Sequence, residues 1–478
     1  MQKQETQEQR DKLSSRDKLH AFSLIIKQKL NVLVTTLSYQ LQGPAAHIQL
    51  LKLAIPMILA NITTPLLGLV DTAVMGHMDS SAQLAGASIG ALILTQLYWV
   101  CGFIRMSATG MSAQAKGENN LTAMAKSFYQ TALIALLLGV LIWLGQQVIL
   151  HTGLWLAAPT AEVAQYSREY FSVRVWGAPA ALLNLALIGW LVGQQKTTSV
   201  LIVQIVGNLL NAGLDITLVW WWDWGVSGVA LASVVAEYTM MLMAVVIALG
   251  QIGWQKPLRA WFDKTARKFL MKLNGDMLLR NLALQACLAF LTIQGARYGQ
   301  TATAVNAILM QFFVLIALGL DGIAYAVEAT VGEAAGAKSP RGVMRQTHRG
   351  LLWSGVFAVG YALVFWAYGP DIIRLLTDIV PLQEAAYPYL GMMTLLPLLA
   401  HWCFLFDGVF VGLTHAKAMR DTMILSALLV FFPVWYVTQA QGNPALWWAL
   451  LAFLLARGVT LAAVFYWRNS KLVTPASA

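Results

Sequence analysis

Long apolar stretches recur along most of the chain, and this pattern constrains the fold more than any other feature. A helix of about 20 apolar residues crosses the hydrocarbon core of a bilayer. We count twelve such stretches, at about residues 51–76, 86–111, 127–150, 168–193, 199–222, 226–250, 277–296, 301–331, 350–368, 386–413, 423–440 and 445–467. The sequence therefore predicts an all-α integral membrane protein with twelve transmembrane helices.

Composition and charge placement agree with a polytopic membrane protein. Only 11% of the residues are charged, whereas soluble globular domains carry about 25%. Most of the 32 Lys and Arg lie before the first helix, after the last, or in loops that follow even-numbered helices. Basic residues mark cytoplasmic loops, so we expect both termini in the cytoplasm of a bacterium and the helices in its inner membrane. The net charge of +10 then reflects membrane topology, and we expect no nucleic-acid partner.

Residues 1–49 form a polar N-terminal extension that we expect to be partly disordered. The stretch from Leu24 to Leu41 is too polar to span a membrane and lacks the cleavage site of a signal peptide. An amphipathic surface helix and a misplaced start codon both remain open for this segment.

The twelve helices divide into two lobes of six, residues 50–252 and 276–470. A basic cytoplasmic linker, 253–275, joins the lobes, and a tail, 471–478, follows them. A constant shift aligns Ala115 with Ala334, Gly117 with Gly336 and Gly193 with Gly412. Six helices per half keep both halves in one orientation, so a pseudo-two-fold axis should run along the membrane normal, with a central cleft.

Acidic residues inside the apolar segments indicate sites that bind an ion or a substrate, because a carboxylate at membrane depth is costly. In the first lobe, Asp71 lies in helix 1, while Asn211 and Asp215 share a face of helix 5. Helices 4 and 6 add Asn184 and Ser233. These residues form a candidate polar cluster, and a hydrogen-bonded packing network is the alternative. Desolvation favours the neutral acid, so Asp71 and Asp215 could exchange a proton, and the same oxygens could bind Na⁺.

The second lobe carries a separate acidic set. Asp321, Tyr325 and Glu328 share a face of helix 8, and Asp407 lies in helix 10. We expect them to contact a cationic substrate. Ion pairing with the intramembrane Arg457 or Arg105 is the alternative.

Two prolines, Pro56 and Pro65, precede Asp71 in helix 1. Proline removes a backbone hydrogen bond and can kink a helix, so this helix could bend as part of a gate, or keep a static kink. The cysteines Cys101, Cys287 and Cys403 all lie in apolar helices, and we expect no disulfide. The sequence contains no convincing phosphate-binding loop, zinc-protease motif or nucleophile elbow, so a membrane-embedded enzyme is the least favoured function.

Short motifs resemble those of the MATE (multidrug and toxic compound extrusion) family. Val70-Asp71-Thr72 with Gly76-His77 is similar to the family's first-helix motif, and Asp407 with Gly412 and Arg420-Asp421-Thr422 to its tenth-helix motif. Residues 61–71 and 320–329 resemble the DNA-damage-inducible (DinF) branch. The resemblance covers about residues 48–470.

The resemblance implies a secondary multidrug antiporter that exchanges H⁺ or Na⁺ for organic, cationic or amphipathic compounds by alternating access. It implies that Asp71, Asn184, Asn211 and Asp215 match a first-lobe coupling site, and Ser233 stands where relatives have a hydroxyl. No cofactor is implied, and we expect a monomer. Helix 7, taken as 277–296, has no acid, unlike one sodium-coupled group, which favours protons. A lipid-linked saccharide flippase of the same superfamily is the alternative.

Overall fold

The computed structural model describes residues 43–76 and 80–467, and the predictions for Leu24–Leu41 and for the tail 471–478 lie outside these ranges. The chain divides into two units, Met1–His47 and Ile48–Ala478. The described residues of the first unit are Gly43 and the start of the first labelled helix. All that follows concerns the second unit.

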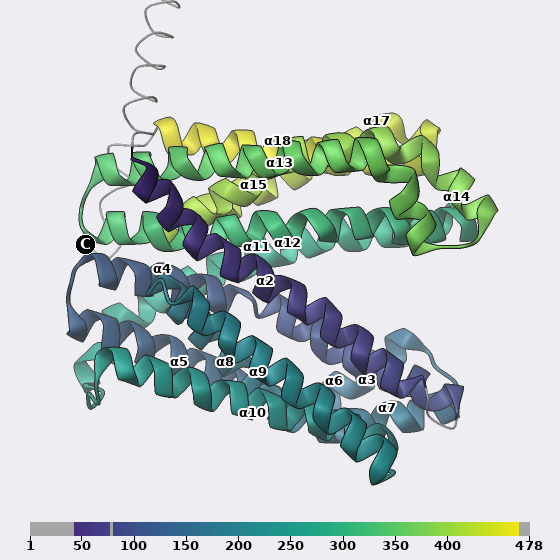
Figure 1. The fold of residues 1–478 in the computed structure, drawn as a ribbon, viewed down its shortest axis with the longest axis horizontal. Coiled ribbons are helices and arrows are strands. Elements are labelled where there is room, and N and C mark those ends of the chain that lie inside the picture. Colours follow the sequence, from purple (N-terminus) through teal and green to yellow (C-terminus); the bar gives the residue numbers. More distant parts are fainter. Residues whose placement is uncertain (1–42, 77–79, 468–478) are drawn as a thin grey trace, which may run out of the picture. The chain divides into compact units, whose positions relative to one another are not determined.

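The described part of the chain folds into helices and connecting turns, with no β-strand (Figure 1). Twelve spans in it are long and apolar enough to cross a membrane, which confirms the predicted fold class. The first-half helices are α2 (Pro44–Met75), α3 (Ser81–Val100), α4 (Phe103–Gly117), α5 (Leu121–Leu144), α6 (Gln146–Ala157), α7 (Ala161–Arg174), α8 (Ala178–Gly193), α9 (Thr197–Asp215) and α10 (Gly225–Ile252). The second-half helices are α11 (Lys264–Arg297), α12 (Gln300–Gly336), α13 (Pro340–Leu376), α14 (Val380–Ala386), α15 (Leu390–Gly412), α16 (Ala416–Ser426), α17 (Phe432–Thr438) and α18 (Asn443–Trp467).

Several spans are interrupted, and corresponding interruptions occur in both halves. Short 3-10 turns at Val175–Gly177 and Tyr387–Tyr389 precede α8 and α15. Pro179 lies in the first turn of α8, directly after the first break, and Pro388 lies within the second break. A proline at the start of a helical segment costs little, because its missing N–H would have no partner there. Two segments have π-helical hydrogen bonding: Ile216–Trp221, which follows α9, and Ala427–Phe431, which follows α16. The first begins directly after Asp215, and π segments are frequent at functional sites.

Glycines allow close helix packing inside each half. A β-carbon on Gly193 would lie 2.6 Å from the Thr109 carbonyl oxygen, so α8 packs directly on the backbone of α4. A β-carbon on Gly412 would lie 2.6 Å from the Glu328 carbonyl oxygen, so α15 packs in the same way on α12. These two glycines were aligned by the sequence repeat, and small residues serve this purpose in membrane helices.

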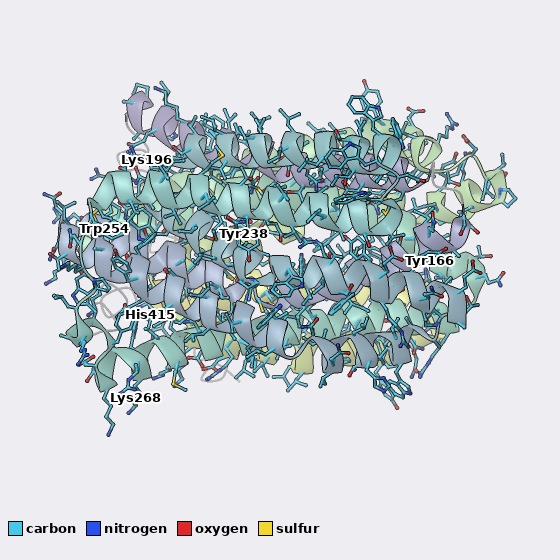
Figure 2. All side chains as sticks on the ribbon, turned by 90° about the horizontal axis from the view of Figure 1, so that it is seen from below. Tyr166, Lys196, Tyr238, Trp254, Lys268 and His415 are labelled. Carbon is cyan, nitrogen blue, oxygen red and sulfur yellow. The ribbon has the colours of Figure 1, made fainter. Side chains whose placement is uncertain are left out.

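The two halves meet along α4 and α12, close to the ends of both helices. A β-carbon on Gly117 would overlap the Glu333 carbonyl oxygen, and one on Gly336 would overlap the Gln114 carbonyl oxygen. The Gln114 side chain also donates to the Gly412 carbonyl at 2.9 Å. These contacts lie at the basic end, where Figure 2 shows Lys196, Trp254, Lys268 and His415, while Tyr166 lies at the other end.

Helix α2, a first-half helix, runs diagonally past the others in Figure 1 and also contacts the second half. Its first part packs on α12, because Gly322 faces Ile58 and the Asn61 amide donates to the Leu318 carbonyl at 3.2 Å. Its last residues, Val74 and Met75, belong to a hydrophobic cluster of the first half. The helix continues through Pro56 and Pro65, and the gating role of these prolines stays a prediction.

Helix 7 is longer than its apolar run. We expected residues 277–296, but α11 begins at Lys264, because the Asp263 carboxylate caps it by accepting from the Ala266 N–H at 2.8 Å. The added residues mix lysines and an arginine with apolar side chains such as the buried Leu270 and Leu273, and all but Asp276 were assigned to the linker. The longer helix includes Asp276, which is buried like Arg280 one turn later. Helix 7 therefore does carry an acid, one residue outside the predicted range.

Candidate functional site

The first-lobe cluster is assembled from helices α2, α9 and α10. Asn211 hydrogen-bonds the Ser233 hydroxyl at 3.2 Å. With its amide nitrogen turned toward the acids, Asn211 donates to Asp71 Oδ1 and Asp215 Oδ2, each at 3.1 Å, while its oxygen accepts from the Ser233 N–H at 3.0 Å. Amide orientation is assigned from the hydrogen-bond network, and this orientation satisfies both ends of the amide. The structure thus brings Asp71, Asn211, Asp215 and Ser233 together, as the sequence predicted.

The two carboxyl groups of this cluster share one hydrogen-bond donor, the Asn211 amide nitrogen. Ionised carboxylates offer only acceptors, so a proton on one of the two acids would add a second donor to the set. Asp215 is fully buried and its Oδ1 has no partner in the described part of the chain. A pair of acids in this arrangement can hold one proton and release it when the surroundings change.

Asn184 lies beside a buried ion pair that the sequence did not predict. Its amide donates to the backbone carbonyl of Glu237 at 2.8 Å, one turn after Ser233. The Glu237 carboxylate pairs with both terminal nitrogens of Arg174, and Arg174 also lies 5.8 Å from the centre of the Tyr98 ring. An Arg within one apolar segment and a Glu within another was the signal that could have revealed this pair.

In the second lobe, Asp407 accepts from two arginines, Arg280 of α11 and Arg457 of α18. Pairing with Arg457 was the alternative to substrate contact. Arg280 lies inside the predicted span 277–296, but it was not considered as a partner for Asp407. Two guanidinium groups on one buried carboxylate stabilise charges that would each be costly alone.

Glu328 pairs with Arg105 across the two halves. The terminal nitrogens of Arg105, on α4, contact the two Glu328 carboxylate oxygens at 3.0 and 3.3 Å. The same guanidinium lies 4.2 Å from the centre of the Tyr325 ring. Asp321, one turn before Tyr325, is half-buried and makes no ion pair or hydrogen bond with the residues that the structure describes. The predicted face of α12 therefore forms, but its glutamate is already paired.

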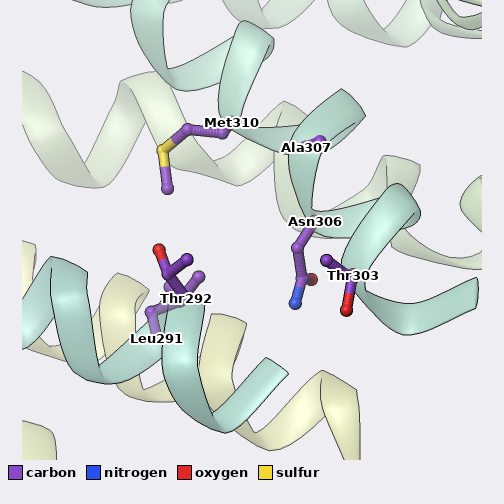
Figure 3. Close-up of a pocket in the computed structure, with 6 residues that line it drawn as sticks. All are labelled: Leu291, Thr292, Thr303, Asn306, Ala307 and Met310. Carbon is purple, nitrogen blue, oxygen red and sulfur yellow. The ribbon is translucent and has the colours of Figure 1, made fainter. Parts of the chain in front are cut away.

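The described residues provide no metal-binding group that adds to these clusters, and the pocket between α11 and α12 is separate from them. Across residues 43–76 and 80–467, no three His, Cys, Asp or Glu side chains converge on a point. A pocket of about 190 Å³ between α11 and α12 includes Thr292, Asn306 and Met310 (Figure 3). The Asn306 amide is bonded to Asn443 at 2.8 Å and its oxygen accepts from Trp447 at 2.8 Å, so we interpret it as a helix-packing group.

Comparisons with known proteins point to one family. A model of the MatE family matches the chain twice, over residues 56–217 and 277–437, once in each predicted lobe. The DNA damage-inducible protein F of Escherichia coli is 41% identical over 87% of this chain and 92% of its own length. The multidrug resistance protein NorM of Aliivibrio fischeri is 22% identical over 88% and 94%.

Solved structures share the fold. A crystal structure of a MATE protein in complex with MaD3S has a TM-score of 0.78 at 16% identity and covers 89% of this chain and 96% of its own. A structure described as the outward-facing conformation of a multidrug resistance MATE transporter has a TM-score of 0.77 at 17% identity, with the same coverage.

Proposed function

The chain belongs to the MATE family of transporters, and we propose that it is an antiporter that exchanges protons for organic compounds across the bacterial inner membrane. Proteins of this family carry substrates and are not enzymes. The observation that carries the proposal is the set formed by Asp71 and Asp215, both of which accept from the Asn211 amide. This set can hold one proton at membrane depth, which a coupling site must do.

Protons fit this set better than sodium does. A sodium ion needs several oxygen ligands at once, and the Asn211 nitrogen, a donor, faces both acids when its network is satisfied. The second lobe offers no better site. Asp407 is occupied by Arg280 and Arg457, and Asp276 by Arg420.

The substrate is proposed to be an organic cation or amphipath that enters between the lobes. The relative from Aliivibrio fischeri is named a multidrug resistance protein, and the second-lobe acids supply negative charge. Asp321 and Tyr325, both half-buried, are the first groups for a cation to meet. Glu328 and Asp407 would join only if their arginines moved aside.

A lipid-linked saccharide flippase is not favoured. Such a carrier needs arginine or lysine side chains free to hold pyrophosphate. Arg105, Arg280 and Arg457 are each paired with a carboxylate. We propose in addition that the protein works as a monomer with both termini in the cytoplasm, in agreement with its basic loops.

Dye efflux in inverted vesicles tests the proposal. We expect accumulation of a cationic dye when the lumen is made acidic and no response to an imposed sodium gradient. Transport driven by sodium alone would overturn the proton assignment. Transport that follows neither gradient would overturn secondary antiport.

A further inference from the structure

A hollow of about 680 Å³ opens at the basic end of the molecule, apart from both acidic clusters. Its walls come from the two halves. Helices α4 and α5 form one side, and the polar start of α11, with Thr414 after α15, forms the other. Figure 2 shows Lys268 at this end, together with the loop residues Lys196 and His415. The hollow therefore lies where the basic loops gather.

Three lysines surround the hollow: Lys126 from the first half, and Lys268 and Lys272 from α11. The two on α11 are four residues apart and so lie on one helix face. None of the three has an ion pair within the described ranges. Two carboxylates also reach the hollow, Glu118 and Asp263.

The remaining lining separates into polar and apolar parts. Asp263 is engaged as the cap of α11, and Glu118 is exposed. The polar groups Gln114, Ser127 and Gln130 lie beside the lysines, while Met111 and Phe269 supply apolar contacts. A site with amines and amides next to apolar side chains matches a group that is anionic at one end and aliphatic at the other.

We propose that this hollow binds the phosphate headgroup of an anionic phospholipid from the adjoining membrane leaflet. Basic pockets between transmembrane helices on the cytoplasmic side bind such headgroups. Free inorganic phosphate has the same charge and acceptors, but it has no chain for Met111 and Phe269 to contact.

A bound headgroup would tie the two halves together. Lys126 belongs to α5 of the first half, and Lys268 and Lys272 to the second. Gln114, in the same lining, already bonds the Gly412 carbonyl and the Thr414 hydroxyl across the halves. One phosphate held by lysines from both sides would strengthen this closure, so anionic lipid should favour the state that is closed at the basic end.

The test compares the natural full-length protein with three variants. The first carries Lys126→Gln, Lys268→Gln and Lys272→Gln. The matched control carries Lys256→Gln, Lys264→Gln and Lys338→Gln, which removes equal charge from exposed lysines outside the hollow. The third places Arg at the three pocket positions. Native mass spectrometry measures the phosphatidylglycerol that each form retains. Paired spin labels on Thr122 and Lys417, both exposed and outside the lining, report closure in vesicles with and without phosphatidylglycerol.

We expect the Gln form to retain about tenfold less phosphatidylglycerol than the control, since each lysine near an anionic surface contributes substantially. The Arg form should bind as the natural protein does, and phosphatidylglycerol should narrow the label distance in all forms except the Gln form. Equal retention in the Gln form and the control would overturn the proposal. If inorganic phosphate displaces the lipid and by itself narrows the label distance, the ligand is phosphate and not the lipid.

Discussion

At the scale of single residues, the hydrogen-bonded acids of the first lobe carry the strongest expectation. Asp71→Asn keeps the shape of the side chain but cannot exchange a proton in the relevant range. We expect proton-driven efflux to fall at least about tenfold, with unchanged folding, and the same for Asp215→Asn. Asp371→Asn, an exposed acid at the end of α13, is the control. Normal efflux by a well-expressed Asp71→Asn protein would contradict the coupling role.

Asp407 leads to a different expectation because of its two arginines. Asp407→Asn would leave Arg280 and Arg457 without their shared carboxylate, and breaking a buried pair costs about 3–5 kcal/mol. We expect a clear loss of thermal stability in detergent. Adding Arg457→Gln should restore part of that loss, because one uncompensated charge is removed.

The same variants separate packing from substrate binding. If Asp407→Asn remains as stable as the natural protein and only raises the KM for a cationic dye, Asp407 is a substrate group rather than an ion-pair partner. If the double variant recovers both stability and dye affinity, its role is structural.

At the scale of helices, the contact of α4 with α12 depends on glycine. A β-carbon at Gly117 or Gly336 would overlap a carbonyl oxygen of the opposite helix, so backbone must move to accommodate it. We expect Gly117→Ala and Gly336→Ala to separate the halves at the basic end and to slow transport. Gly250→Ala and Gly360→Ala are the controls, since nothing lies within 4 Å of their added carbon. Spin-label distances across the basic end provide the measurement, and equal distances in both sets would refute the idea.

The positions of the helices could be predicted from the sequence more completely than the contacts between helices. Apolar length alone identified twelve spans, because lipid forces each crossing segment to satisfy its own backbone. The start of α11 was wrong, because Lys264–Asp276 is helical through its cap and not through hydrophobicity. Arg280 lay inside the predicted helix 277–296, but its pairing with Asp407 depends on how α11 packs against α15, which the sequence does not give.

Spacing along one helix predicted which residues share a face, and this succeeded for Asn211 and Asp215. It could not predict which helix lies opposite. The pairs Arg174–Glu237 and Arg105–Glu328 join segments far apart in the chain, and only the packing of the helices decides them. The glycines aligned by the sequence repeat came closest to predicting contacts between helices, because close helix packing requires small residues at the contact points.

At the scale of the whole molecule, the orientation in the membrane can be tested with one long helix. Helix α13 has 37 residues, about 55 Å at 1.5 Å per residue, so its ends must lie on opposite sides of a core of about 30 Å. Lys338 and Asp378 flank its two ends, and both are exposed. The three native cysteines are buried, so labelling of introduced cysteines should have a low background.

The basic loops predict that Lys338 lies in the cytoplasm, because positive charge is retained on that side during insertion. A membrane-impermeant maleimide should therefore label Asp378→Cys in intact spheroplasts and Lys338→Cys only in inverted vesicles. The reverse pattern would show that the protein has the opposite orientation in the membrane, with the lysine-lined hollow in the outer leaflet. Because the direction of efflux follows from this orientation, the labelling result decides whether an acidic vesicle lumen is the correct driving condition for the transport assay.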